Sequence, residues 1–195
     1  MRLNDIFDRI VVINLDSRTD RMEAFDEQAK KYALEYIRFP AVPADPPNLL
    51  PSWACKASHQ AVIKQAVADK VKRLFVFEDD AQFVDNFNEK LEDVYSKIPE
   101  DWDMFYLGAW HLEYRPYAEG VVKMIESYSA HAYGINEHYL QEAYSQIYLP
   151  KFADVALSLK HPHIKAFCAK PALVGQTPGY SDIEKEYRDV TEHYL

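Results

Sequence analysis

The chain has 195 residues, 48% of them hydrophobic, so its length and composition are those of a globular protein with a full core rather than a disordered or fibrous one. Its 22 basic and 31 acidic residues give a formal net charge of −9, which disfavours nucleic acid and anionic lipid as partners. No apolar run approaches the ~18 residues of a membrane span, and the N-terminus lacks the apolar segment of a secretory signal. Two cysteines, Cys55 and Cys168, are too few for a disulfide framework or a cysteine-based zinc site, so we expect reduced thiols in a cytoplasmic protein.

Strands and helices are predicted to alternate along the chain. A β-branched run favours a buried strand, and apolar residues that recur every three or four positions indicate an amphipathic helix. Five prolines between residues 40 and 51 indicate a surface loop. On these grounds strands are expected at 9–15, 34–39, 73–77, 103–108, 121–125, 129–135 and 164–169. Helices are expected at 22–32, 52–69, 87–98, 137–148 and 153–160.

This order of elements predicts an α/β fold with a mostly parallel central sheet and helices on both faces. The strands at 121–125 and 129–135 are expected to pair in antiparallel fashion at an edge of that sheet. Ser181 and Glu184 have the spacing of a capping box, which predicts a C-terminal helix. Since the sequence contains no repeat, low-complexity tract or clear linker, residues 1–195 are expected to form a single domain.

Three consecutive carboxylates, Glu78, Asp79 and Asp80, follow the apolar run at 73–77. In open α/β sheets ligands bind at the carboxyl ends of the strands, and clustered acids need a positive charge beside them. Residues two apart on an extended backbone share a side, so Glu78 and Asp80 are expected to face one way and Asp79 the other. The pattern predicts a site where Mg²⁺ or Mn²⁺ holds a diphosphate, although the same acids also suit the start of a following helix.

Three polar residues lie at or just beyond the end of the first predicted strand: Asn14, Arg18 and Arg21. Guanidinium groups beside a strand-to-helix turn can hold a phosphate, and the backbone N–H groups of the helix start add donors. The alternative is that Arg18 and Arg21 pair with Asp16 and Asp20 on the surface. The acidic motif on the neighbouring strand favours the first interpretation, because both would lie at the same edge of the sheet.

The helix predicted at 52–69 carries Cys55, Ser58 and His59. Adjacent helical residues point away from each other, so Ser58 and His59 do not form a nucleophilic pair. We expect His59 to be a core histidine or one that supports a neighbouring site. Cys55 has no activating base in the sequence and is interpreted as structural.

Asp154 begins a short predicted helix. It is either an acid that suits the helix dipole or a general base for an acceptor hydroxyl. His161 and His163 follow that helix, and although they are candidate metal or phosphate ligands, we expect them in a surface loop.

Several short blocks, taken in order, resemble glycosyltransferase family 25, which includes bacterial lipo-oligosaccharide galactosyltransferases and collagen β-galactosyltransferases. The resemblance covers residues 9–183. The blocks are residues 10–15 with Arg18 and Arg21, the Cys-Lys-Ala-Ser-His segment at 55–59, the Phe-Glu-Asp-Asp-Ala segment at 77–81, Tyr-Leu-Gly at 106–108, residues 130–135, Asp154 with Leu157, and residues 171–176 followed by Ser-Asp-Ile at 181–183.

The resemblance implies a fold of the GT-A type and an inverting hexosyltransferase that uses a UDP-sugar, typically UDP-galactose. The acceptor would be a glycan, a lipo-oligosaccharide or a protein hydroxyl. By the same resemblance Glu78 and Asp80 hold Mn²⁺ or Mg²⁺, and Asp154 is the catalytic base or binds the acceptor, with Asp182 as its rival. The implied donor-binding residues are Asn14, Arg18, Arg21, Ser58, His59, Glu78 and Asp79. Two alternatives remain open from the sequence: a metal-dependent phosphoester hydrolase, and a sugar-nucleotide-binding module without catalysis.

Overall fold

The computed structural model describes residues 1–194. The main strands are β1 (Arg9–Asn14), β2 (Ile37–Pro40), β3 (Arg73–Glu78), β5 (Met104–Tyr106), β6 (Trp110–Ala118), β7 (Val121–Tyr128), β8 (Ala132–Asn136) and β9 (Ala166–Ala169). The α-helices are α1 (Thr19–Lys31), α2 (Pro51–Ala68), α3 (Phe87–Tyr95), α4 (Glu137–Ile147) and α5 (Ala153–Ser158). Short 3₁₀ turns occur at Leu3–Asp5, His161–His163 and Thr191–Tyr194.

These strands form one eight-stranded sheet in the order β2-β1-β3-β8-β5-β9-β7-β6. Strand β1 is parallel to β2 and β3, and β5 is parallel to β9. Strand β8 is antiparallel to β3 and β5, and β7 is antiparallel to β9 and β6. Apart from β7 and β8, the strands of this sheet therefore share one direction, which confirms the predicted α/β fold with a mostly parallel sheet.

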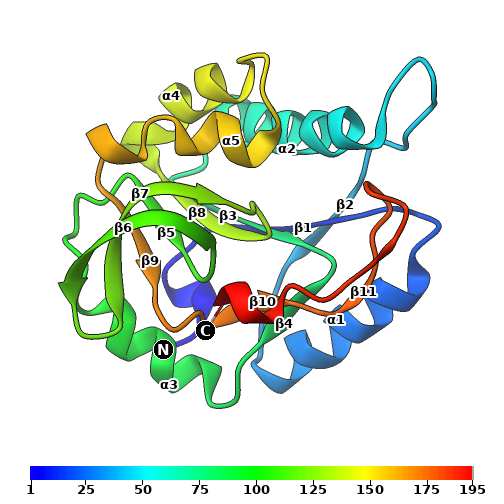
Figure 1. The fold of residues 1–195 in the computed structure, drawn as a ribbon. Helices are drawn as coiled ribbons and strands as arrows, with labels where there is room; N and C mark the ends of the chain where they lie inside the picture. Colours follow the sequence, from blue (N-terminus) through cyan, green and yellow to red (C-terminus); the bar gives the residue numbers. More distant parts are fainter. Residues whose placement is uncertain (195) are drawn as a thin grey trace.

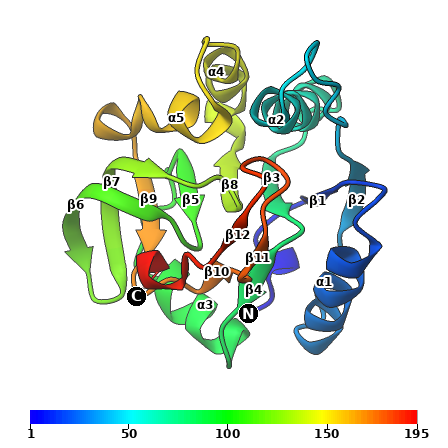
Figure 2. The same ribbon diagram turned by 45° about the vertical axis from the view of Figure 1, so that its right-hand side comes forward.

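Helices cover both faces of the sheet (Figure 1). Helices α2, α4 and α5 pack together on one face, and α1 and α3 lie on the other, as the turned view also shows (Figure 2). The alternation of β3 divides its side chains between two cores: Phe75 and Phe77 face α1 and α3, whereas Leu74 and Val76 face α2. Glu78 continues the second series, so it ends the strand on the α2 side.

Three expectations about the elements are wrong. Strand β8 lies in the middle of the sheet rather than at an edge, and all five of its residues are buried. It pairs with β3 and β5 rather than with β7, the partner that was expected. The edge is formed by β6, which the sequence did not suggest. Instead of a C-terminal helix, β11 (Gly179–Tyr180) and β12 (Tyr187–Arg188) form an antiparallel hairpin. Ser181 Oγ does accept from the Glu184 amide at 3.1 Å, but Lys185 has φ of 62° and the chain reverses there.

A second, two-stranded sheet lies next to the acidic turn. Strand β4 (Ala81–Phe83), directly after that turn, pairs with β10 (Val174–Gln176). Gly108 permits this pairing, because a Cβ at position 108 would lie 2.0 Å from the Val174 carbonyl oxygen. Gln176 is thereby placed next to Asp80. In the described part of the chain, no helix combines the length and the apolar character needed to cross a membrane.

Candidate active site

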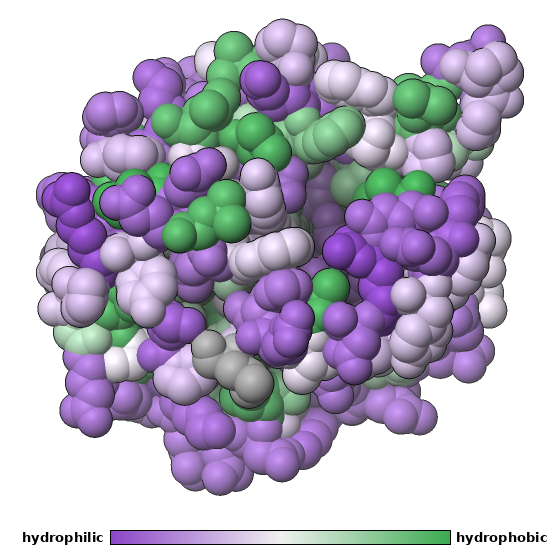
Figure 3. All heavy atoms as spheres, viewed as in Figure 1, coloured by the Kyte–Doolittle hydropathy of each residue, from purple (hydrophilic) through white to green (hydrophobic). Residues whose placement is uncertain are grey.

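A cavity of about 770 Å³ opens where β1 and β3 end. Its walls come from the proline-rich loop at 41–44, the first half of α2, the acidic turn at 79–80, the start of α5 and the 179–188 hairpin. The space-filling view shows a hollow in this face, with hydrophilic side chains gathered along one side of it (Figure 3). The carboxyl ends of parallel strands are where such folds bind ligands, so this cavity is the candidate active site.

Asp79 and Asp80 share one guanidinium. Arg21 Nη1 donates to Asp79 at 3.0 Å and to Asp80 at 3.3 Å. Asp79 also accepts from Asn14 Nδ2 at 2.7 Å, and Asp80 from Gln176 Nε2 at 3.4 Å. The expectation that Asp79 and Asp80 face opposite sides is therefore wrong. Strand β3 ends at Glu78, so the extended geometry on which that expectation rested does not reach residues 79–80.

The acidic turn is short of positive charge. Burial, together with the charge of Glu78, raises the pKa of the Asp80 carboxyl to about 7, and burial raises the pKa of Asp79. One guanidinium thus faces the buried Asp79 and the partly buried Asp80, so the negative charge of the two carboxylates is incompletely compensated. Oxygen donors with unmatched charge are what Mg²⁺ and Mn²⁺ bind in proteins, so Asp79 and Asp80 fit the metal that the family resemblance implies.

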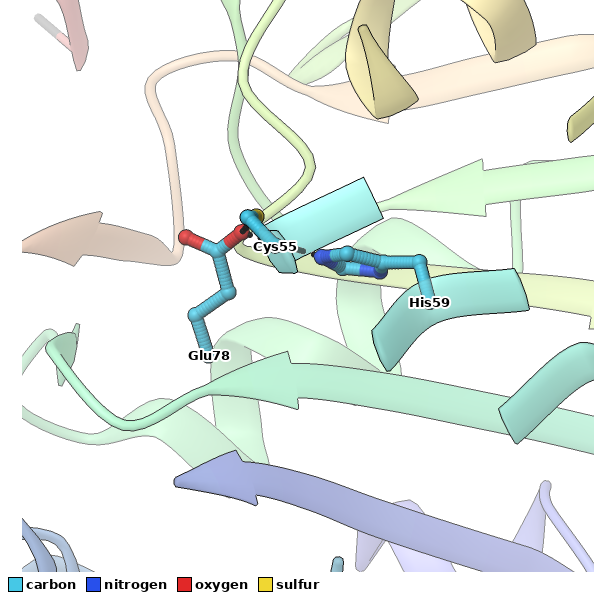
Figure 4. Close-up of side chains that lie close together, drawn as sticks. All are labelled: Cys55, His59 and Glu78. Carbon is cyan, nitrogen blue, oxygen red and sulfur yellow. Dashed lines mark hydrogen bonds and ion pairs between the residues drawn. The ribbon is translucent and has the colours of Figure 1, made fainter. Parts of the chain in front are cut away.

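Glu78 has different neighbours from Asp80. His59 Nε2 lies 3.1 Å from Glu78 Oε1, and the Cys55 thiol lies 3.8 Å from the same oxygen (Figure 4). Burial acts to raise the pKa of Glu78, but the contact with His59 outweighs it and leaves that pKa below its usual value. Burial and the Glu78 charge raise the pKa of the Cys55 thiol. The structure therefore brings Glu78 to α2, while Asp80 stays with Arg21 and Gln176.

The two predicted arginines are used differently. Arg21 reaches the acidic turn and also donates to the Tyr180 carbonyl at 2.9 Å. Arg18 instead forms ion pairs with Asp20 at 2.8 Å and with Asp182 at 2.5 Å. The surface-pairing alternative thus describes Arg18 in part, whereas Arg21 has the position expected of a site residue. Asn14 ties the β1–α1 connection to the acidic turn, because its Nδ2 donates to the Arg18 carbonyl as well as to Asp79.

Both candidate bases, Asp154 and Asp182, line the cavity, and they come from different segments of the chain. Asp154 lies in the first turn of α5, where its two oxygens accept from the Ser129 amide at 3.1 Å and the Val155 amide at 2.8 Å. Each oxygen keeps a further lone pair for a ligand. Asp182 lies on the 179–188 hairpin and is held by Arg18.

Ser58 has a structural role, and of the two histidines after α5 one is buried and the other exposed. Ser58 Oγ accepts from the Val42 amide at 2.8 Å and donates to the Ala54 carbonyl, which ties the proline-rich loop to α2. His161 is buried rather than at the surface, with Nε2 3.2 Å from the Tyr106 hydroxyl, so that expectation is wrong for His161. His163 is exposed as expected.

Two residues of the site were not predicted. Gln176 contacts Asp80 and accepts from the Tyr194 hydroxyl at 2.5 Å. Ser129 positions Asp154 through its backbone amide. Gln176 lies in the block at residues 171–176 that resembles the family, so the sequence did contain a signal for this residue. A backbone donor leaves no such signal.

Comparison with known proteins agrees with the geometry. Residues 50–156 match the model for "Glycosyltransferase family 25 (LPS biosynthesis protein)". Procollagen galactosyltransferase 2 of Homo sapiens is 27% identical over 233 aligned positions, covering 91% of this chain and 37% of that protein. Procollagen lysyl hydroxylase and glycosyltransferase of Acanthamoeba polyphaga mimivirus is 32% identical, covering 65% of this chain and 18% of that protein. Inactive glycosyltransferase 25 family member 3 of Mus musculus is 39% identical over 61 positions, covering 28% of this chain and 10% of that protein.

The family match covers more than half of the chain, so the chain belongs to glycosyltransferase family 25. It spans between about a tenth and somewhat over a third of the length of these curated relatives. Among solved structures, A197 from STIV superimposes with a TM-score of 0.53 at 11% identity and covers 92% of each chain, which supports the fold alone. Family membership and the mostly parallel sheet confirm the expected GT-A type of α/β fold.

Proposed function

We propose that this protein transfers a hexose, galactose by analogy with the family, from a UDP-sugar to a hydroxyl group of a glycan, lipo-oligosaccharide or protein acceptor. The observation that carries the proposal is the cavity at the ends of β1 and β3. Asp79 and Asp80, which share a single guanidinium, line this cavity together with Asp154 of α5. Relatives of this chain are named galactosyltransferases, which supports the choice of sugar.

The proposed reaction inverts the anomeric centre in one displacement. Asp154 takes the proton of the acceptor hydroxyl as its oxygen bonds to the anomeric carbon and the UDP oxygen leaves. Two backbone amides orient Asp154, whereas Asp182 is engaged by the Arg18 guanidinium, so Asp154 is the better candidate base. Asp182, on the hairpin beside the cavity, is then a candidate for acceptor binding.

The donor diphosphate is proposed to lie at the acidic turn. The resemblance implies Glu78 and Asp80 as ligands of Mn²⁺ or Mg²⁺; we propose Asp79 with Asp80 instead, because Glu78 contacts Cys55 and His59. The ion would offset the charge that develops on the departing UDP. Arg21 fixes the two carboxylates in one place, and Asn14 fixes Asp79 from the side of β1.

A module that binds the sugar nucleotide without turnover is the competing proposal, because some relatives are named inactive. Calorimetric titration of UDP-galactose, UDP-glucose and UDP-N-acetylglucosamine, with and without Mn²⁺, tests both. Metal-dependent binding that is lost in Asp80→Asn, followed by donor turnover, supports the transferase. Asp85→Asn is the matched control, because Asp85 is exposed and pairs with Lys31 outside the cavity. Binding without turnover of donor against a broad acceptor panel supports the inactive module, and no binding of any donor by the folded protein refutes both.

A further inference from the structure

The α2 wall of the cavity contains a mixed group of potential metal ligands: Cys55, His59 and Glu78 (Figure 4). Each side chain offers one ligand atom, and the three atoms all lie within 4.8 Å of one another. The Glu78 oxygen is 3.1 Å from His59 Nε2 and 3.8 Å from Cys55 Sγ. The proposed transfer reaction makes no use of the thiol.

The fold brings the three side chains together from two elements. Cys55 and His59 are four residues apart on α2, so they lie on one face of that helix. Glu78 ends β3 on the side that faces α2, in series with Leu74 and Val76. Two cysteines are too few for a cysteine-based zinc site, but here one thiol joins an imidazole and a carboxylate from elsewhere in the chain.

We infer that Cys55, His59 and Glu78 form a binding site for a borderline-soft divalent cation of the Zn²⁺ type, with the fourth position open to the cavity. Thiolate and imidazole ligands select Zn²⁺ or Co²⁺ over Mg²⁺ and Mn²⁺, which prefer oxygen. Ligands at the usual distances of ~2.0–2.3 Å around a tetrahedral ion stand ~3.3–3.6 Å apart. The two distances of 3.1 and 3.8 Å need shifts of a few tenths of an ångström to reach that geometry, and the Cys55 and His59 ligand atoms, within 4.8 Å of each other, must close to the same spacing.

The surroundings of His59 support this assignment. Its ring is fully buried, and the Tyr133 hydroxyl lies 3.0 Å from Nδ1. Without metal, the 3.1 Å contact between Nε2 and the Glu78 carboxylate contains a proton on Nε2. When the ion binds, the imidazole takes the tautomer in which Nδ1 donates its proton to the Tyr133 oxygen, and Nε2 offers its lone pair to the ion, which is the arrangement usual for metal-bound histidines. When the ion binds, the Cys55 thiol releases its proton to solvent, and the thiolate and carboxylate together balance the two positive charges.

This inference goes beyond the proposed transfer reaction and does not rest on it, so its test uses the metal alone. Co²⁺ titrated into the metal-free full chain, without sugar nucleotide, is expected to give one equivalent of a species with a thiolate-to-cobalt charge-transfer band. One equivalent of Zn²⁺ should remove the band, since zinc binds such ligand sets more tightly than cobalt. The band should be absent in Cys55→Ser and present in Cys168→Ser, because Cys168 lies in β9 and is not part of the group.

Two further variants separate this site from the acidic turn. Asp80→Asn should keep the band, and His59→Gln should weaken cobalt binding at least tenfold. Circular dichroism verifies that each variant is folded, and Cys55→Ala replaces Cys55→Ser if the serine variant is not. A band that survives in a folded Cys55 variant, or no band in the wild type at millimolar Co²⁺, would overturn the assignment.

Discussion

The buried histidine after α5 makes the stability of the protein depend on pH in a way that can be calculated. His161 packs against the Tyr106 ring and hydroxyl, and Ser127 Oγ lies 3.5 Å from its Nδ1. Burial lowers the pKa of His161 from 6.5 to about 3. The folded protein therefore keeps this imidazole neutral at a pH where the unfolded chain protonates it. The stabilisation is complete above pH 6.5 and is lost as the pH falls toward 3.

The size of the effect follows from the two pKa values. Between pH 6.5 and 3 the free energy of unfolding should fall by ~1.4 kcal/mol per pH unit through this group alone. At pH 5 the loss relative to pH 8 amounts to about 2 kcal/mol. Replacement of His161 by Gln removes this dependence, whatever constant cost the lost packing adds at every pH.

Urea unfolding of the wild type and of His161→Gln at a series of pH values from 4.5 to 8 measures the difference. We expect the gap between the two proteins to narrow by about 2 kcal/mol as the pH falls from 8 to 5. His163→Gln is the matched control, since His163 is exposed in the same 3₁₀ turn, and its gap should stay constant. A gap for His161→Gln that does not change with pH would refute the assignment of a neutral buried imidazole.

Four further outcomes are expected. Asp154→Asn should lower kcat by ~10²–10⁴-fold if Asp154 is the base, whereas Asp182→Asn should mainly raise the acceptor KM; steady-state kinetics would contradict this if the two effects were exchanged. Phe152→Ala should raise the acceptor KM several-fold without changing donor affinity, because Phe152 lines the cavity and is half exposed beside Trp53; an equal loss of donor binding in calorimetry would argue against it. Zn²⁺ should inhibit Mn²⁺-dependent transfer, with an inhibition constant at least tenfold higher in Cys55→Ser than in the wild type. An unchanged inhibition constant in Cys55→Ser would show that Zn²⁺ does not inhibit through the Cys55 thiol. Ser58→Ala should cost about 1 kcal/mol in urea unfolding, and no loss would show that the contact with the proline-rich loop is not stabilising.

Local sequence patterns were enough to predict the first half of the fold. The β-branched run of β1, the phenylalanine-rich run of β3 and the amphipathic α1 and α2 all form close to their expected bounds. The second half was harder, because the partner of a strand depends on contacts that no local pattern encodes. Strand β8 is buried on both faces, which suits the centre of the sheet, yet its position after β7 in the chain suggested an edge.

The residues of the candidate site likewise fall into those that local sequence patterns predicted and those that depend on contacts between distant segments. Arg21, Asp79 and Asp80 were predicted from residue type and position beside a strand end, and they lie together. The neighbours of Glu78 were not predicted, because Cys55 and His59 come from α2, and no local pattern shows which face of that helix meets the end of β3. Backbone donors such as the amide of residue 129 depend on the path of the chain and leave no mark in its side chains.

The order in which the chain supplies the cavity has a consequence for its synthesis. The acidic turn and α2 emerge from the ribosome before α5 and the 179–188 hairpin, which complete the cavity. Before those segments arrive, the acids of residues 78–80 already have Asn14, Arg21, Cys55 and His59 as partners, but they lack Gln176 and the far wall of the cavity, and β8 has not yet entered the sheet beside β3. Ligand affinity should therefore arise only after the 179–188 hairpin has emerged, and a split of the chain between α3 and β5 should yield two fragments that gain affinity only when they reassociate.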